Sequence, residues 1–373
     1  QLAVCRGPDV RVRRIFVKKK EVWSGNASSG DRIDIDQSEI LGGDEFGNGG
    51  IQASVDFFGG DLVQPASTFL NTPERQQVSQ PAATDTCPTY PRTAHLVVRE
   101  LTEADATGSE RGAYLGNSTN IDPWAIEAER FPALFSGQSA GENLIGSDGD
   151  VNPMNVIYEL LTSTDFGFGQ GASQIDVGTG SSFLAAADRL RDEGNGFSMV
   201  LDRETTARDF IHEILRQIDG SLFVDTSTGK WTVQLTRAAD DPEFGYDINT
   251  VPQLGDDNIL KIDEFTRGSW DQTDDPLQVR FVKRADNYKT SHSLGQNSAN
   301  AAILGGLSVT QQLGSPGRSN YPGVKDSQVA ADLAWRDIRA QSYPLASGLF
   351  TVTAGFEGLR LGQVVAWTNV RRG

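Results

Sequence analysis

Sulfur and histidine are scarce in this chain, which has two Cys, two Met and three His among 373 residues. Two cysteines cannot hold a disulfide-rich scaffold together, and their spacing fits no zinc motif. No stretch reaches the roughly 18 uncharged apolar residues that a membrane-spanning helix needs. Basic residues are also few, because the chain has 33 Lys and Arg but 50 Asp and Glu, which gives a formal net charge of −17. That balance argues against a surface built to bind DNA phosphates.

The residues that are plentiful point to a folded protein of several domains. Gly accounts for 40 residues and hydrophobic side chains for 38 %. The length suits two or three domains of about 100–200 residues each, and the apolar content is too high for a disordered chain. Residue 1 is Gln and no signal peptide follows, so we expect a processed or truncated start. Without a signal peptide, two unpaired thiols at Cys5 and Cys87 are favoured over a disulfide, although pairing stays open.

The first region, residues 1–148, is predicted to be β-rich. Residues 31–35 and 51–57 alternate between apolar and polar side chains, which is typical of half-buried strands. Strand character is also expected over residues 13–23 and from residue 95 onward. The basic run at 18–20 favours a solvated strand edge, with contact to an acidic partner as the alternative.

The second region, residues 149–254, changes to a helical period. A helix is predicted to start at Asn152-Pro153, since Asn caps helices and Pro is tolerated in the first turn. Further helices are predicted over 182–193 and from Thr206 to Gly220, followed by a hairpin that turns at Thr228-Gly229.

The third region, residues 255–373, is predicted to be β-rich again. Strands are expected over 277–282, 349–353 and 359–367, with one helix over 326–339. An apolar run close to residue 373 predicts that this domain continues beyond it. The order of the three regions indicates a mainly β protein with an α+β insert.

Motifs of known chemistry lack the context that they require. The G-x-S-x-G match at 137–141 should be followed by a helix, but the next residues have the composition of a loop. The calcium-loop match that starts at Asp148 has Pro153 where the loop needs Gly. Acidic pairs such as Asp240-Asp241, Asp256-Asp257 and Asp274-Asp275 are expected by chance among 50 acids. The sequence therefore predicts no catalytic, metal-binding or cofactor-binding residues, and no enzyme.

Several segments, taken together and in order, resemble one family. The first are VWSG (22–25), ILGGDEFGNGGI (40–51) and SVDFFGG (54–60), and the next are YLGN (114–117) and WAIEAERFP (124–132). The most specific is NPMNVIYELLT (152–162), with FGFG (166–169), Ile175-Asp176 and Ser182-Phe183 after it. The last are Asp219-Gly220, GKW (229–231), the helix from 326 and GQVV (362–365), where Gln363 departs from the expected acid. The chain thus resembles the tail-tip or baseplate hub proteins of long-tailed phages, including the lambdoid tip attachment (host specificity) protein and gene-transfer-agent homologues.

The resemblance implies a fold and an assembly. The fold would be tandem tube-like β-barrel hub domains with the α+β portion inserted, and three chains would assemble as a trimeric ring around an axial channel. This hub of a siphophage tail tip would contact the distal tail protein, the tail tube and the tape-measure protein, and other tip or receptor-binding proteins. DNA would pass through the channel without specific binding. The protein would be assembled in the host cytoplasm and be located in the virion.

The resemblance also implies a set of signature residues with structural roles. They are Trp23, Gly42, Gly43, Gly49, Gly50, Gly116, Arg130, Asn152, Pro153, Gly167, Asp176, Phe183, Gly220, Gly229 and Gly362. We further hypothesise that part of the acidic excess lines the channel, where it would repel DNA; the simpler interpretation is that the charge keeps the particle soluble. A cell-wall (peptidoglycan) hydrolase and a glycan-binding adhesin of the tail tip remain alternatives.

Overall fold

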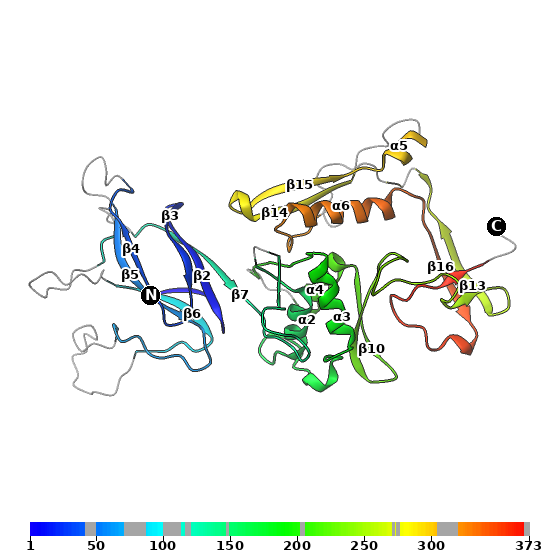
Figure 1. Cartoon of the computed structure of the whole chain (residues 1–373), viewed down its shortest axis with the longest axis horizontal. Helices are drawn as coiled ribbons and strands as arrows, with labels where there is room; N and C mark the ends of the chain where they lie inside the picture. Colours follow the sequence, from blue (N-terminus) through cyan, green and yellow to red (C-terminus); the bar gives the residue numbers. More distant parts are fainter. Residues whose placement is uncertain are drawn as a thin grey trace, which may run out of the picture. The chain divides into compact units, whose positions relative to one another are not determined.

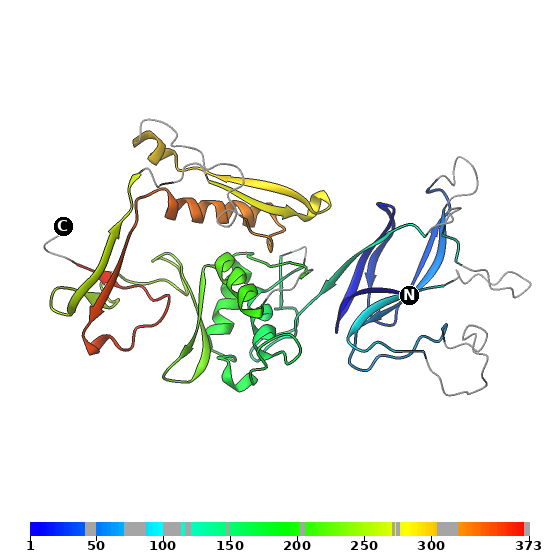
Figure 2. The ribbon, with the colours of Figure 1, turned by 180° about the vertical axis from the view of Figure 1, so that it is seen from behind.

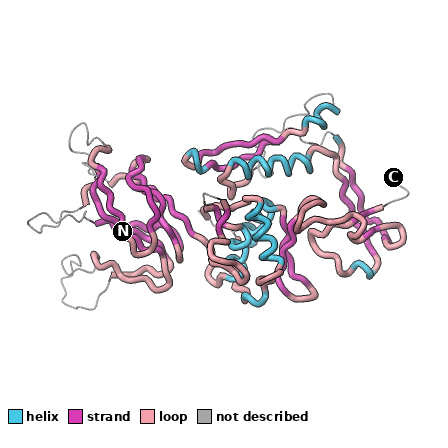
Figure 3. The backbone as a smooth tube through the Cα atoms, viewed as in Figure 1, coloured by secondary structure: helices cyan, strands magenta, loops and turns pink. Residues whose placement is uncertain are grey.

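Two units make up the chain, Gln1–Phe131 and Pro132–Gly373, called here the N-terminal and the C-terminal unit. The computed structural model (Figure 1) describes residues 1–41, 50–70, 87–99, 113–115, 121–146, 149–201, 206–270, 273, 277–303 and 320–368. Strands outnumber helices (Figure 3), which confirms the mainly β class. The division into three domains at 148/149 and 254/255 stays a prediction.

The N-terminal unit consists of two antiparallel sheets. Its strands are β1 (Leu2–Arg6), β2 (Val10–Val17), β3 (Lys20–Ala27), β4 (Arg32–Gln37), β5 (Ile51–Gly59), β6 (Thr93–Arg99) and β7 (Trp124–Arg130). One sheet has the order β1-β6-β5-β4 and the other the order β3-β2-β7. Alternate residues such as Ile33 and Ile35 of β4 are buried, and they pack with Ile15 of β2 and Phe57 of β5 in one core. The alternation predicted for β4 is confirmed, whereas in β5 Ser54 and Phe58 are buried as well as the predicted apolar residues. Among the described residues the two sheets do not close into one barrel.

Lys18 and Lys19 lie in a hairpin turn, whereas Lys20 begins the edge strand β3, so the predicted strand edge holds for Lys20 alone. Val17 pairs with Lys20, and Lys18 and Lys19 between them have φ values of 50° and 68°. Two-residue hairpin loops favour this left-handed backbone because it matches the twist of the flanking strands. The sequence does not predict this turn, since it contains neither Gly nor Asn.

The first part of the C-terminal unit, called here the helical module, is built around three helices. Its elements are β8 (Leu144–Ile145), β9 (Asp150–Val151), α2 (Pro153–Thr162), η1 (Ala172–Gln174), α3 (Ser182–Asp192), α4 (Ala207–Ile218), β10 (Gly220–Asp225) and β11 (Lys230–Leu235). Asn152, Ser181 and Thr206 cap the three helices by accepting hydrogen bonds from backbone amides one turn in. Buried Ile157, Ile214 and Val233 belong to one core that these elements share. The predicted helices and hairpin are confirmed.

A second part, called here the strand–helix module, packs one long helix on a hairpin. It contains β14 (Leu277–Lys283), η3 (Arg284–Asp286), β15 (Lys289–Gly295), α5 (Ser298–Ile303) and α6 (Ser327–Gln341). The two opposite views in Figures 1 and 2 both show α6 lying along β14 and β15. Leu333 and Ala334 of α6 pack with Val279 and Phe281 of β14 in a core of their own. The sequence predicted β14 and α6 but not β15, whose residues KTSHSLG have no apolar alternation.

The remaining elements form two short ribbons. β12 (Gln253–Leu254) pairs in parallel with β17 (Ala366–Trp367), and β13 (Ile259–Arg267) pairs with antiparallel β16 (Ala346–Val352). The strand predicted over 359–367 is wrong except for its last two residues. A turn at Gly362, where φ is 77°, interrupts that segment, and a 3₁₀ turn, η4 (Ala354–Phe356), precedes it. None of the described helices has the length and apolar character that a membrane crossing requires.

Candidate functional site

The G-x-S-x-G segment has the geometry of a surface loop. Ser139 is exposed in a series of turns, and its backbone amide donates to Glu142 Oε2 at 2.7 Å. The next regular element is the short strand β8, so no helix aims the hydroxyl. His212 on α4 and His292 on β15 are both exposed, and no hydrogen bond of the described residues joins either histidine to Ser139.

Two of the acidic candidates, Asp150 and Asp241, have structural roles, whereas Asp240, Asp256 and Asp257 are exposed. Asp148 and the pair Asp274-Asp275 lie outside the described residues. Asp150, in the calcium-loop match, instead forms an ion pair with Arg284. Asp241 binds Arg189 Nη2 at 2.7 Å and accepts hydrogen bonds from two backbone amides of its own loop. Within the described ranges, no three His, Cys, Asp or Glu side chains gather in a way that would hold a metal ion.

The signature residues of the N-terminal unit lie on or beside its strands. Trp23 is on β3, and its ring covers Gly25 so closely that a Cβ on Gly25 would lie 2.5 Å from Trp23 Cζ2. Gly50 precedes β5 with φ at 104°, and a Cβ there would lie 2.7 Å from the Ser38 carbonyl oxygen. Arg130 ends β7 opposite Val10. Gly42, Gly43, Gly49 and Gly116 lie outside the described residues.

The signature residues of the helical module hold its elements together. Asn152 is fully buried; its Oδ1 caps α2, and its Nδ2 donates to the Ala187 carbonyl oxygen on α3 at 2.9 Å. Asp176 Oδ2 accepts from the Ser182 amide at 2.9 Å, which fixes the start of α3. Phe183 is fully buried in the core.

The other signature residues mark close approaches and turns. They are Pro153 in the first turn of α2, Gly167 folded back on the Leu160 carbonyl, Gly220 at the start of β10, Gly229 in the hairpin turn and Gly362 beside Ser221. The structure brings Gly220 and Gly362 close together through Ser221, whereas the whole set does not converge on one site. Their structural role in a family stays a prediction.

A candidate assembly surface lies on the pair β13 and β16, called here the β13–β16 ribbon. Neither strand contributes a buried side chain. Leu260 is 68 % exposed, Leu349 61 %, and Leu345 just before β16 62 %. Trp367 packs on Phe265 and Phe350 with ring centroids 5.4 and 5.1 Å apart. A two-stranded ribbon without a core is marginally stable alone, so this surface favours contact with another chain.

The outer edge of β16 is unprotected. Among the described residues β16 pairs only with β13. Its sequence, ASGLFTV, contains no charged residue and no proline. Edge strands of proteins that remain single usually carry charges, bulges or proline that prevent pairing. This edge is therefore suited to main-chain pairing with a strand of another chain.

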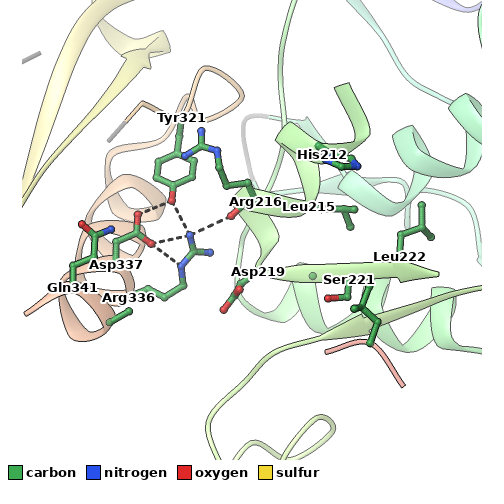
Figure 4. A pocket seen from close by; sticks show the side chains of 13 residues that line it. His212, Leu215, Arg216, Asp219, Ser221, Leu222, Tyr321, Arg336, Asp337 and Gln341 are labelled. Carbon is green, nitrogen blue, oxygen red and sulfur yellow. Dashed lines mark hydrogen bonds and ion pairs between the residues drawn. The ribbon is translucent and has the colours of Figure 1, made fainter. Parts of the chain in front are cut away.

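A polar cavity of about 620 Å³ lies between α4, β10 and α6 (Figure 4). Arg336 on α6 donates to the backbone carbonyl oxygens of Arg216 and Gln217, in the last turn of α4, at 3.3 and 2.6 Å. The same guanidinium donates to the Tyr321 hydroxyl at 2.8 Å and to Asp337 Oδ1 at 2.9 Å. The Tyr321 hydroxyl donates to Asp337 Oδ2 at 2.5 Å. Because every donor in this cluster has an acceptor, the cluster joins helices rather than offering a free cation to a ligand.

Burial governs the ionisation of this cluster. Burial raises the pKa of Tyr321 well above its usual range, and Asp337 raises it further against the opposing effect of Arg336. Burial lowers the pKa of Arg336, but Tyr321 and Asp337 outweigh it, so the net shift is upward. The neutral tyrosine and charged arginine are therefore the stable forms. Sequence reasoning missed this cluster, although Asp337 falls in the buried stripe of α6 that includes Leu333 and Ala334.

Comparison with known proteins finds no family model and no curated protein that matches this sequence. One similar solved structure is a chain of the "Virion of native gene transfer agent (GTA) particle". The two chains superpose with a TM-score of 0.52 at 12 % identity, over 100 % of this chain and 72 % of the other. At this identity the likeness establishes a shared fold.

Proposed function

We propose that this chain is a structural protein of a phage-like virion, and that it serves as the central hub of a tail tip or baseplate. The observation that carries the proposal is the likeness of its fold, over its whole length, to a chain of a gene transfer agent virion. The sequence resemblance to hub proteins points to the same role independently. The exposed motif at 137–141 and the fully engaged polar cluster at Arg336 favour a structural role over a catalytic one.

In this proposal the chain assembles as a homotrimer around a channel for DNA. The distal tail protein, tail tube, tape-measure protein and receptor-binding proteins would be its partners. A ring requires two different complementary surfaces on each subunit. The uncharged edge of β16 and the exposed leucines of the β13–β16 ribbon support one such surface. An acidic wall, part of the −17 charge per chain, would keep DNA from adhering to the channel.

The mass of the purified protein in solution tests the assembly. A trimer of 40.3 kDa chains has a mass of about 121 kDa. We expect the double variant Leu349→Lys, Thr351→Lys to shift the protein toward the monomer, because charges on an edge strand oppose pairing. Val63→Lys, at an exposed position of the N-terminal unit, is the matched control and should leave the mass unchanged.

Three outcomes would count against the proposal. A protein that is monomeric at all concentrations, and whose mass is the same in the double variant, would contradict the proposed trimer. An antibody to this chain that does not label the tail tip of particles would contradict the proposed location. Lysis of purified peptidoglycan by the chain would favour the hydrolase alternative.

A further inference from the structure

The C-terminal unit contains two hydrophobic cores that share no residue. The core of the helical module includes Phe183, Ile214 and Phe197, whereas the core of the strand–helix module includes Phe281 and Leu333. Each module therefore buries its own apolar side chains. Parts of a chain with separate cores can keep their internal structure when the contact between them opens.

The first junction between the modules is polar and loosely packed. Arg336 of the strand–helix module reaches the last turn of α4 in the helical module through hydrogen bonds. In return, the Arg216 guanidinium of α4 lies 4.3 Å from the centre of the Tyr321 ring and donates to the Asn320 carbonyl oxygen. The cavity of about 620 Å³ lies at the same junction. This cavity is open to solvent, so water can reach these contacts.

The second junction is an ion cluster on the strand β9. Asp150 of β9 pairs with Arg284 of the strand–helix module, and Arg284 Nη2 also lies 3.3 Å from Ser198 Oγ. The Lys325 side chain lies beside the same ions. Burial lowers its pKa, Asp150 opposes this effect and Arg284 adds to it, and the net pKa is about 8. Asp150 is buried and Arg284 half-buried, and ions desolvated in this way stabilise a contact less than an apolar interface of the same size.

Main-chain contact completes this second junction. The Ser198 amide donates to the Gly323 carbonyl oxygen at 2.8 Å. The backbone of Gly323 lies directly on the ring of Phe197, so that a Cβ at this position would overlap the ring. The Ser198 amide is thus a reporter of the junction, whereas the amides of Ile157 in α2 and Val279 in β14 report on the two modules themselves.

We infer that the strand–helix module is a detachable module, which separates from the helical module as a unit while both cores stay folded. The contacts that break are those of Arg336 and Arg216 at the end of α4, those of Arg284 with Asp150 and Ser198, and the main-chain bond from Ser198 to Gly323. Water can replace each of these polar contacts, whereas it cannot replace the packing of α6 on β14 and β15. A detachable strand–helix module would give this chain two arrangements of the same folded parts.

Hydrogen exchange of the full chain, followed by mass spectrometry, tests the inference. In the unmodified protein the Ser198 amide should exchange faster than the amides of Ile157 and Val279. Asp150→Asn removes one charge-assisted bond of the junction and no contact inside the strand–helix module. It should raise the Ser198 exchange rate about tenfold or more. The rates at Ile157 and Val279 should change by less than about twofold.

A second variant acts on shape instead of charge. Gly323→Ala places a methyl group against the ring of Phe197 and should produce the same selective rise at Ser198. Two matched controls should leave the Ser198 rate unchanged: Asp188→Asn, at an ion pair on α3, and Gly255→Ala, where a Cβ would meet no atom within 4 Å. If the three amides exchange at one rate in the unmodified protein, or rise together in both variants, the C-terminal unit opens as one body and the inference is wrong.

Discussion

Replacement of Asn152 separates two roles that this side chain combines. Its Oδ1 caps α2 by accepting from the Met154 amide at 3.1 Å, and its Nδ2 donates to the Ala187 carbonyl oxygen at 2.9 Å. Loss of a helix cap costs about 1 kcal/mol. The Ala187 carbonyl keeps its helical donor inside α3, so loss of the second hydrogen bond costs about 0.5–1.5 kcal/mol more. We therefore expect Asn152→Ala to destabilise the helical module by about 1.5–2.5 kcal/mol.

Asn152→Asp is the more informative change. A carboxylate is as good a helix cap as an amide, so a capping role alone predicts almost no loss. In this fully buried position, however, the second carboxylate oxygen would face the Ala187 carbonyl oxygen without a hydrogen between them. We expect a destabilisation of about 2 kcal/mol or more, close to that of the alanine variant.

The measurement must be local, because a chain with several cores does not unfold in one step. Hydrogen exchange of the α2 and α3 amides at rising urea concentration reports the free energy of opening of this module. Asp326→Asn, the reverse exchange at the exposed cap of α6, is the control and should cost only a few tenths of a kcal/mol. An Asn152→Asp protein as stable as the original would refute the role assigned to the bond with Ala187.

Three further changes test other features. The folded pKa of Lys325, about 8, lies below its ordinary value of 10.5, so the unfolded chain binds more protons between these values and the protein becomes more stable as pH rises through that window. From pH 7 to 9.5 the free energy of unfolding of the C-terminal unit should rise by about 1–2 kcal/mol more in the original protein than in Lys325→Met, after allowance for partial exposure. Equal changes with pH in the two proteins would contradict this. Gly50→Ala should destabilise the N-terminal unit in urea unfolding more than Gly30→Ala, since both have positive φ but only Gly50 is crowded by backbone atoms; equal losses would show that φ alone matters. Phe183→Ala should cost about 3–5 kcal/mol in the same α2 and α3 exchange measurement, against less than about 1 kcal/mol for exposed Phe166→Ala; similar losses would contradict the core assignment.

Local signals in the sequence predicted the helical module well. The caps at Asn152 and Thr206, and the turn at Gly229, depend on residues a few positions apart, so pattern reasoning finds them. β13 escaped detailed prediction because two register shifts place Ile259, Ile262 and Phe265 three residues apart instead of two. Of the strand predicted over 359–367 only the last two residues form, because the turn at Gly362 interrupts the extended backbone.

The polar junctions were out of reach for a different reason. Arg336 meets carbonyl oxygens about 120 positions earlier in the chain, and Arg284 meets Asp150 across 134 positions. No spacing rule links residues so far apart. A charged residue in an apolar helical stripe, as at Asp337, is the one local sign that a buried partner exists, and it does not say which partner.

The distribution of buried side chains links folding to assembly. The N-terminal unit, the helical module and the strand–helix module each have a core, whereas the β13–β16 ribbon has none. Burial of a leucine side chain contributes about 1.5–3 kcal/mol, so covering Leu260, Leu345 and Leu349 in a complex would add several kcal/mol to a ribbon that has little stability of its own. Any partner that covers them stabilises the ribbon by mass action. Hydrogen exchange along β13 and β16 should therefore slow as protein concentration rises, while exchange in α2 stays constant; a concentration-independent rate in the ribbon would mean that it is stable without a partner.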